Sequence, residues 1–150
     1  MSDGPMDELE RTFVDPALVL STLQKGGVEF FAGVPDSLLK DFCAYVTDNV
    51  SPDQHKITAN EGSSVAMACG SHFATGNVPF VYMQNSGLGN AVNPLLSLAD
   101  RKVYAVPMVI MIGWRGEPGK KDEPQHIVQG DVLPGMLASM NLNFDVLPDY

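Results

Sequence analysis

Short apolar runs alternate with helical patterns along almost the whole of this 150-residue chain. The apolar runs predict strands, and the segments between them, with apolar residues three or four positions apart, predict helices. Alternation at this spacing favours the α/β class, as three α/β/α layers with a mostly parallel sheet between two layers of helices. The predicted strands are 28–32, 56–59, 79–83, 106–114 and 143–147, and the predicted helices are 16–25, 37–46, 61–75, 89–98 and 133–140.

The chain has the length of one domain. We expect residues 1–14 to form a flexible acidic tail and residues 15–150 to form the domain, because Asp15 before Pro16 is a favourable opening for a helix. The run 106–114 is the most apolar of the predicted strands. We therefore expect it at the centre of the sheet, buried on both faces.

Composition excludes several classes of partner. A formal net charge of -9 argues against nucleic acid and against an anionic membrane surface, although a local group of cations could still attract a small anionic substrate. No apolar run approaches the ~20 residues of a membrane span, and the acidic N-terminus lacks the apolar core of a secretory signal. Cys43 and Cys69 lie in predicted helices without metal-binding spacing, which favours reduced, buried thiols in a cytoplasmic protein with no metal site of its own.

A carboxylate follows the predicted strand 56–59, and a helix rich in small residues begins there. Open α/β sheets bind ligands outside the carboxyl ends of their strands, so Glu61 is well placed to hold or transfer a proton. Gly62 and the two serines after it are small enough for a flat ring to approach the backbone. The alternative is that Glu61 only complements the helix dipole in the first turn.

The glycine-rich segment 84–90 connects a predicted strand to a predicted helix. A dinucleotide fingerprint would need a third glycine where this chain has Val92, and no P-loop lysine follows, so both nucleotide motifs are excluded. Turn geometry explains the glycines, but it explains the amide side chains of Gln84, Asn85 and Asn90 less well. In the loop 33–38, helix capping by Asp36 or Ser37 is a sufficient explanation.

The segment 113–126 predicts a long polar loop beyond another strand. It carries the cations Arg115, Lys120 and Lys121 together with His126, whose imidazole can titrate near neutral pH and serve as a proton donor. Long loops in compact domains tend to be functional. A solvated charged loop without a function is the alternative.

These loops together resemble the thiamine diphosphate-dependent decarboxylases, most closely the members that act on phosphonopyruvate. The resemblance extends from about residue 16 to the end of the chain. The α subunit of the members that act on sulfopyruvate is the nearest alternative. The matching stretches are Gly33-Val34-Pro35-Asp36-Ser37-Leu38-Leu39, Asn60-Glu61-Gly62, YMQNSGLGNAVNPLLSL at 82–98 and GWRGEPGKKDEPQH at 113–126.

The resemblance implies a pyrimidine-binding domain, the N-terminal half of a carboxy-lyase that converts phosphonopyruvate to phosphonoacetaldehyde and carbon dioxide. Glu61 would contact N1′ of the aminopyrimidine ring of thiamine diphosphate, and His126 would transfer a proton or orient the substrate. The other residues that the resemblance implicates are Asn85, Gly87, Leu88 and Asn90 at the cofactor, and Asp36, Ser37, Arg115, Lys120 and Lys121 at the anionic 2-oxo acid substrate.

Family members bind the diphosphate and Mg²⁺ through a second domain that carries a Gly-Asp-Gly motif. Here Gly130-Asp131 is followed by Val132, so we expect the chain to need a diphosphate-binding domain or subunit, in a homo- or hetero-oligomer. We also expect the isolated chain to be inactive and its uncovered apolar surface to drive self-association. A non-catalytic truncated paralogue that associates with full-length subunits is a further alternative, and a flavodoxin-like binding domain is a distant one.

Overall fold

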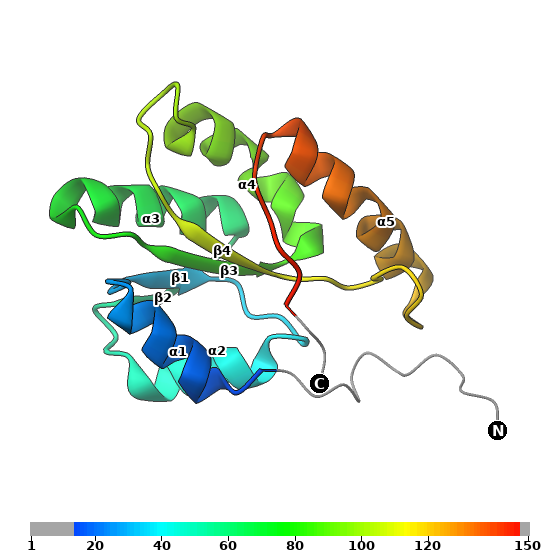
Figure 1. The fold of residues 1–150 in the computed structure, drawn as a ribbon, viewed down its shortest axis with the longest axis horizontal. Helices are drawn as coiled ribbons and strands as arrows, with labels where there is room; N and C mark the ends of the chain where they lie inside the picture. Colours follow the sequence, from blue (N-terminus) through cyan, green and yellow to red (C-terminus); the bar gives the residue numbers. More distant parts are fainter. Residues whose placement is uncertain (1–13, 148–150) are drawn as a thin grey trace.

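Four parallel strands form one sheet in the computed structural model, which describes residues 14–147 (Figure 1). The strand order is β2-β1-β3-β4. The elements in chain order are α1 (Pro16–Lys25), β1 (Phe31–Gly33), α2 (Lys40–Asn49), β2 (His55–Ile57), α3 (Glu61–Thr75), β3 (Phe80–Gln84), the 3₁₀ turn η2 (Asn85–Gly87), α4 (Leu88–Pro94), the π-helical turn η3 (Leu95–Ala99), β4 (Val109–Gly113) and α5 (Pro124–Ser139).

The helices cover the sheet in two layers. In Figure 1, α1 and α2 lie on one face, and α3, α4 and α5 lie on the other. The strand β3 explains why both faces attract helices, because its successive side chains point in opposite directions. Phe80 and Tyr82 pack in the core on the side of α1 and α2, whereas Val81 and Met83 pack in the core with α3, α4 and α5. The predicted α/β class and the parallel sheet are thus confirmed.

Local signals set the ends of the helices. The side chain of Asp15 accepts a hydrogen bond from the backbone N–H of Ala17 at 3.0 Å, which caps α1 as predicted. At the other end of α3, Gly76 adopts a left-handed φ of 78°, a conformation that glycine reaches without strain. Both cysteines are buried free thiols, as predicted, and burial raises the pKa of each.

The prediction of a central strand at 106–114 is wrong. In the part of the chain that the structure describes, residues 14–147, β4 is an edge strand, and Val109 is 40% exposed. A central position requires a neighbouring strand on each side, and the predicted strand 143–147 does not form: that segment has no regular structure. Phe144 and Val146, the alternating residues that suggested a strand, are exposed.

The last helix begins nine residues earlier than predicted, at Pro124 instead of residue 133. Proline is favoured at the first helical position because its missing N–H would have no partner there. We had predicted His126 in a loop, but it lies in the first turn of α5. The predicted tail at 1–14 falls almost entirely outside the described residues.

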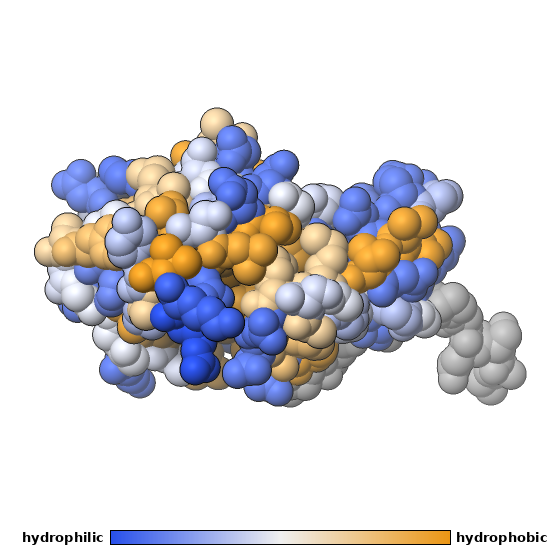
Figure 2. All heavy atoms as spheres, turned by 90° about the horizontal axis from the view of Figure 1, so that it is seen from above, coloured by the Kyte–Doolittle hydropathy of each residue, from blue (hydrophilic) through white to orange (hydrophobic). Residues whose placement is uncertain are grey.

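Apolar side chains remain on the surface of the layer formed by α3, α4 and α5. Figure 2 views the molecule from this side and shows apolar patches among polar ones. Exposed large apolar residues of α3 and α5 are Met67, Phe73, Ile127, Val128 and Val132. Self-association through such a surface stays a prediction. Among the helices of residues 14–147, none has the length and apolar character needed to cross a membrane.

Candidate functional site

The loops singled out in the sequence meet at the carboxyl edge of the sheet. Backbone hydrogen bonds hold the strand ends together: Thr58 N donates to Gly33 O at 3.0 Å, and Val34 N donates to Tyr82 O at 3.2 Å. The Asn85 side chain after β3 donates to the backbone oxygen of Arg115 after β4 at 2.8 Å. The carboxyl ends of all four strands therefore contribute to one region.

Glu61 is the first residue of α3, directly after the loop that leaves β2. The preceding Asn60 caps this helix, since its side chain accepts from the backbone N–H of Ser63 at 3.0 Å. The Glu61 Oε2 atom accepts a hydrogen bond from Asn90 Nδ2 at 2.8 Å. The side chain is partly exposed. A carboxylate that the Asn90 side chain holds in place and that still reaches solvent can meet a ligand.

Two glycines allow the loop after β3 to close onto Glu61. A Cβ atom on Gly87 would lie 2.2 Å from Glu61 Oε1, and one on Gly62 would lie 2.6 Å from the backbone oxygen of Asn90. A larger residue at position 62 would push the two segments apart, and one at position 87 would displace the Glu61 side chain. The predicted cofactor residues Gly87 and Asn90 thus surround Glu61, whereas the side chain of Leu88 is fully buried in the core and leaves only its main chain for a ligand.

The two serines that follow Gly62 lie in the first turn of α3. The Ser64 Oγ atom lies 2.6 Å from Thr58 Oγ1, and Ser64 is fully buried. This hydroxyl pair ties the start of α3 to the end of β2. Ser64 therefore has a structural role at the start of α3.

Asp36 is a buried carboxylate between the ends of β1 and β4. Its side chain accepts from Leu38 N at 3.2 Å, and a Cβ atom on Gly113 would lie only 2.1 Å from Asp36 Oδ2. Its Oδ1 atom and Asn85 Oδ1 are buried acceptors without a hydrogen-bond partner among the described residues. Burial raises the pKa of Asp36, and backbone N–H groups and the charge of Arg115 oppose that shift.

Asp122 is a functional candidate that the sequence analysis missed. Its side chain is only 3% exposed and contacts both Arg115 and His126. Arg115 Nε donates to Asp122 Oδ2 at 2.7 Å, Arg115 Nη2 donates to Oδ1, and His126 Nδ1 lies 2.8 Å from Oδ1. The spacing of four residues to His126 was the available signal, but it was hidden in a run of charged residues.

The predicted substrate cations have different surroundings. Arg115 Nη1 donates to Ser37 Oγ at 2.8 Å, so two predicted substrate residues are in contact. The charge of Arg115 is, however, already paired with Asp122. Lys120 and Lys121 lie on the connection between β4 and α5, and Lys121 is exposed. A role of these residues in substrate binding stays a prediction.

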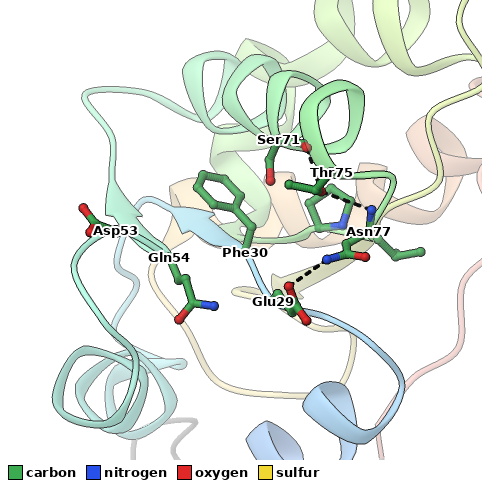
Figure 3. A pocket seen from close by; sticks show the side chains of 9 residues that line it. Glu29, Phe30, Asp53, Gln54, Ser71, Thr75 and Asn77 are labelled. Atoms are coloured by element: carbon green, nitrogen blue, oxygen red, sulfur yellow. Dashed lines mark hydrogen bonds between the residues drawn. The ribbon is translucent and has the colours of Figure 1, made fainter.

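A separate pocket of about 300 Å³ opens at the opposite edge of the sheet (Figure 3). Phe30 and Glu29, just before β1, contribute to its lining, and Asn77 Nδ2 donates to Glu29 Oε2 at 2.7 Å. This pocket lies at the amino ends of the strands, so it is remote from Glu61 and shares no lining residue with the loops described above.

A parallel α/β sheet whose strand ends present a carboxylate among glycine-rich loops defines a ligand- or cofactor-binding domain. The family described as "Thiamine pyrophosphate enzyme, N-terminal TPP binding domain" matches residues 16–136. The chain belongs to this family, which confirms the resemblance found in the sequence.

Two relatives and one solved structure show which members of this family the chain is similar to. It is 37% identical over 131 residues to the phosphonopyruvate decarboxylase of Streptomyces hygroscopicus, a match that covers 87% of this chain and 32% of the relative. It is 34% identical over 126 residues to the sulfopyruvate decarboxylase subunit alpha of Methanococcus maripaludis, covering 84% of this chain and 72% of that subunit. Benzoylformate decarboxylase from Polynucleobacter necessarius matches with a TM-score of 0.52 and 26% identity over 69% of this chain and 19% of that one. The chain thus spans about a third of the phosphonopyruvate decarboxylase.

Proposed function

We propose that this chain provides the pyrimidine-binding half of a thiamine diphosphate-dependent 2-oxo acid decarboxylase that acts on phosphonopyruvate and releases phosphonoacetaldehyde and carbon dioxide. The observation that carries the proposal is the Glu61 carboxylate at the carboxyl edge of the sheet. It accepts a hydrogen bond from Asn90, and Gly87 packs closely against it. The family and the identity to phosphonopyruvate decarboxylases support it.

The residues present fit the aminopyrimidine end of the cofactor. Gly62 and Gly87 let the loop after β3 close onto Glu61 without a competing side chain, and a carboxyl group can hold a proton against a ring nitrogen. When bound, the cofactor supplies the carbon nucleophile and the electron sink that decarboxylation of a 2-oxo acid requires. In this proposal Glu61 holds the proton at N1′, and Asn90 keeps the carboxyl group oriented.

Other side chains of the edge would act on the substrate. The contact between Arg115 and Ser37 offers hydrogen-bond donors to a phosphonate, and His126 offers an imidazole that can accept or deliver a proton. The buried Oδ1 atoms of Asp36 and Asn85 are suited to accept from a bound donor group. Mg²⁺ and the diphosphate would be held by a separate domain or subunit.

A second candidate is the α subunit of a sulfopyruvate decarboxylase. The observation in its favour is coverage, since the chain covers 72% of the Methanococcus maripaludis subunit alpha but 32% of the Streptomyces hygroscopicus enzyme. In both cases a diphosphate-binding partner completes the site. The two candidates differ in the anion next to the 2-oxo acid, a phosphonate or a sulfonate.

A complementation assay tests these proposals. The full chain is mixed with a purified diphosphate-binding domain of a phosphonopyruvate decarboxylase, or with a sulfopyruvate decarboxylase β subunit, in the presence of thiamine diphosphate and Mg²⁺. We expect aldehyde to form from phosphonopyruvate faster than from sulfopyruvate, and to form at a greatly reduced rate with Glu61→Gln. The reverse preference would favour the second candidate. Stable assembly without turnover of either acid would contradict both and favour a non-catalytic paralogue.

A further inference from the structure

The Asp122 carboxylate is surrounded by hydrogen-bond donors. Besides Arg115 and His126, the backbone N–H of Gly116 donates to Oδ2 at 2.9 Å, and the backbone N–H of Glu123 donates to Oδ1 at 2.8 Å. Both oxygen atoms therefore accept from an arginine nitrogen and from the backbone. A carboxyl group in such surroundings is favoured in its ionised form, because the ionised form only accepts hydrogen bonds.

The backbone contacts hold this carboxylate in place independently of its charged partners. Gly116 has a φ of 67°, and a Cβ atom there would lie 1.9 Å from the backbone oxygen of His126. Gly130 packs just as closely, with its Cβ position 1.8 Å from the backbone oxygen of Gly116. The turn after β4 is thus pressed against the first two turns of α5. The anchored carboxylate can impose an orientation on a side chain that contacts it.

The contact with His126 determines which ring nitrogen carries the proton. An ionised carboxylate has no hydrogen to donate, so the His126 nitrogen that lies 2.8 Å from it must be the donor. In the neutral imidazole the proton then sits on Nδ1, and Nε2 is left as an acceptor. An Asp–His pair of this kind sets the tautomer of histidines that act as general bases.

We propose that Asp122 is a positioning residue that holds the His126 imidazole as its Nδ1–H tautomer, with Nε2 available for proton transfer, and that holds the Arg115 guanidinium against Ser37. The part that concerns proton transfer rests on the proposed function, in which His126 serves the reaction. The tautomer and the orientation of Arg115 follow from the contacts of the chain itself.

Nuclear magnetic resonance of the full chain tests the tautomer without cofactor or partner. Long-range ¹H–¹⁵N correlation spectra report which ring nitrogen is protonated, and His126→Asn identifies the signals of His126 among the three histidines. At a pH where the ring is neutral, we expect the proton on Nδ1. A wild-type spectrum with the proton on Nε2 would overturn the proposal, whether or not any variant folds.

Asp122→Ala is the decisive variant. Both oxygens of Asp122 accept from Arg115 and from the backbone, so asparagine could place its amide oxygen at either position, whereas alanine removes the acceptor of His126 Nδ1 altogether. The Nδ1–H tautomer then loses its partner, and we expect a protonated Nε2 to appear in the spectra. Glu123→Ala is the matched control, because it removes a carboxylate one residue away that does not cap α5 through its side chain. A proton that stays entirely on Nδ1 in Asp122→Ala would overturn the proposal.

The assembled enzyme tests the catalytic consequence. We expect Asp122→Ala to lower kcat by about tenfold or more, since general acid–base catalysis contributes about 10²–10⁴-fold, and Asp122→Glu to recover part of the loss. An unchanged kcat with a switched tautomer would contradict the link to proton transfer. Wild-type protein that never turns over would count against the proposed function, while the spectra would still decide the role of Asp122.

Discussion

Two carboxylates at the same edge of the sheet have opposite surroundings. Among the residues that the structure describes, Glu61 receives one side-chain hydrogen bond, from Asn90, and it remains partly exposed. The side chain of Asp122 is almost fully buried, and arginine, histidine and backbone donors occupy both of its oxygen atoms. The Glu61 carboxylate can therefore still accept a hydrogen bond from a ligand, whereas the Asp122 carboxylate uses its acceptor positions to hold other side chains.

The different surroundings of the two carboxylates follow from the residues that pack against them. Glu61 lies against Gly87, which has no side chain and adds no hydrogen bond to the carboxylate. Asp122 lies inside a turn that closes back onto α5 and directs backbone N–H groups at it. One edge thus combines an accessible carboxylate with a fixed anionic support. Changes in either group should have distinguishable effects on turnover and on stability.

The largest effect is expected from Glu61→Gln. The amide keeps the size of the side chain but cannot take up or release a proton at a ring nitrogen, so turnover in the complemented enzyme should fall by about 10²–10⁴-fold. The melting temperature should change little, because the side chain is partly exposed. Asp48→Asn, on the exposed surface of α2, is the control. A variant with more than a tenth of wild-type turnover would remove Glu61 from the chemistry.

Gly130→Ala tests the close packing that holds the turn around Asp122 against α5. The new methyl group would meet the backbone oxygen of Gly116 at 1.8 Å, so the turn or α5 must move. Overpacking of this kind costs about 1–3 kcal/mol in the free energy of unfolding, which urea denaturation measures. Gly135→Ala, in the same helix with nothing within 4 Å, should instead stabilise by about 0.5–1 kcal/mol. Equal effects of the two variants would argue against the close packing around Asp122.

Gly87→Ala should separate turnover from stability. Its Cβ would meet the flexible end of Glu61, which can move at little cost to folding but takes the carboxylate out of place. Turnover should fall about tenfold, because small misplacements of reacting groups are costly in rate. Gly89→Ala, with nothing within 4 Å, is the control and should keep its activity. Full activity in Gly87→Ala would show that the position of Glu61 is not critical.

The smallest effect concerns Asp36, a third carboxylate of this edge. Burial raises its pKa above the usual value of 3.8, so its contribution to stability is complete below that pH and is lost as the pH rises through the folded-state pKa. Asp36→Asn cannot ionise. As the pH rises from about 4 towards neutrality, urea denaturation should therefore show the variant gaining stability relative to wild type. The opposite trend would mean that the folded state favours the charged form.

Local patterns were enough to predict the fold around Glu61. The helix 61–75 was predicted with its observed bounds, because Asn60 and Gly76 are strong capping signals on either side of it. The strand 79–83 was predicted to within one residue of β3, since a continuous apolar run bounded by Pro79 on one side and polar residues on the other is a clear signal. The gathering of the loops at one edge followed from the parallel sheet.

Contacts between distant segments could not be predicted in the same way. Alternating apolar residues at 143–147 suggested a strand, but a strand needs a partner, and sequence alternation does not specify one. The closeness of Gly87 to Glu61 joins residues far apart in the chain. The role of Asp122 depends on a turn that folds back onto α5, and the sequence does not show this contact. In the sequence, Asp122 is one of several neighbouring charged residues and does not stand out.

A crystal structure of the complemented enzyme with thiamine diphosphate bound tests the central claim most directly. We predict that a carboxyl oxygen of Glu61 lies within hydrogen-bond distance, about 2.6–3.2 Å, of N1′ of the aminopyrimidine ring. A Glu61 side chain that points into solvent, or an aminopyrimidine bound away from the start of α3, would contradict the account.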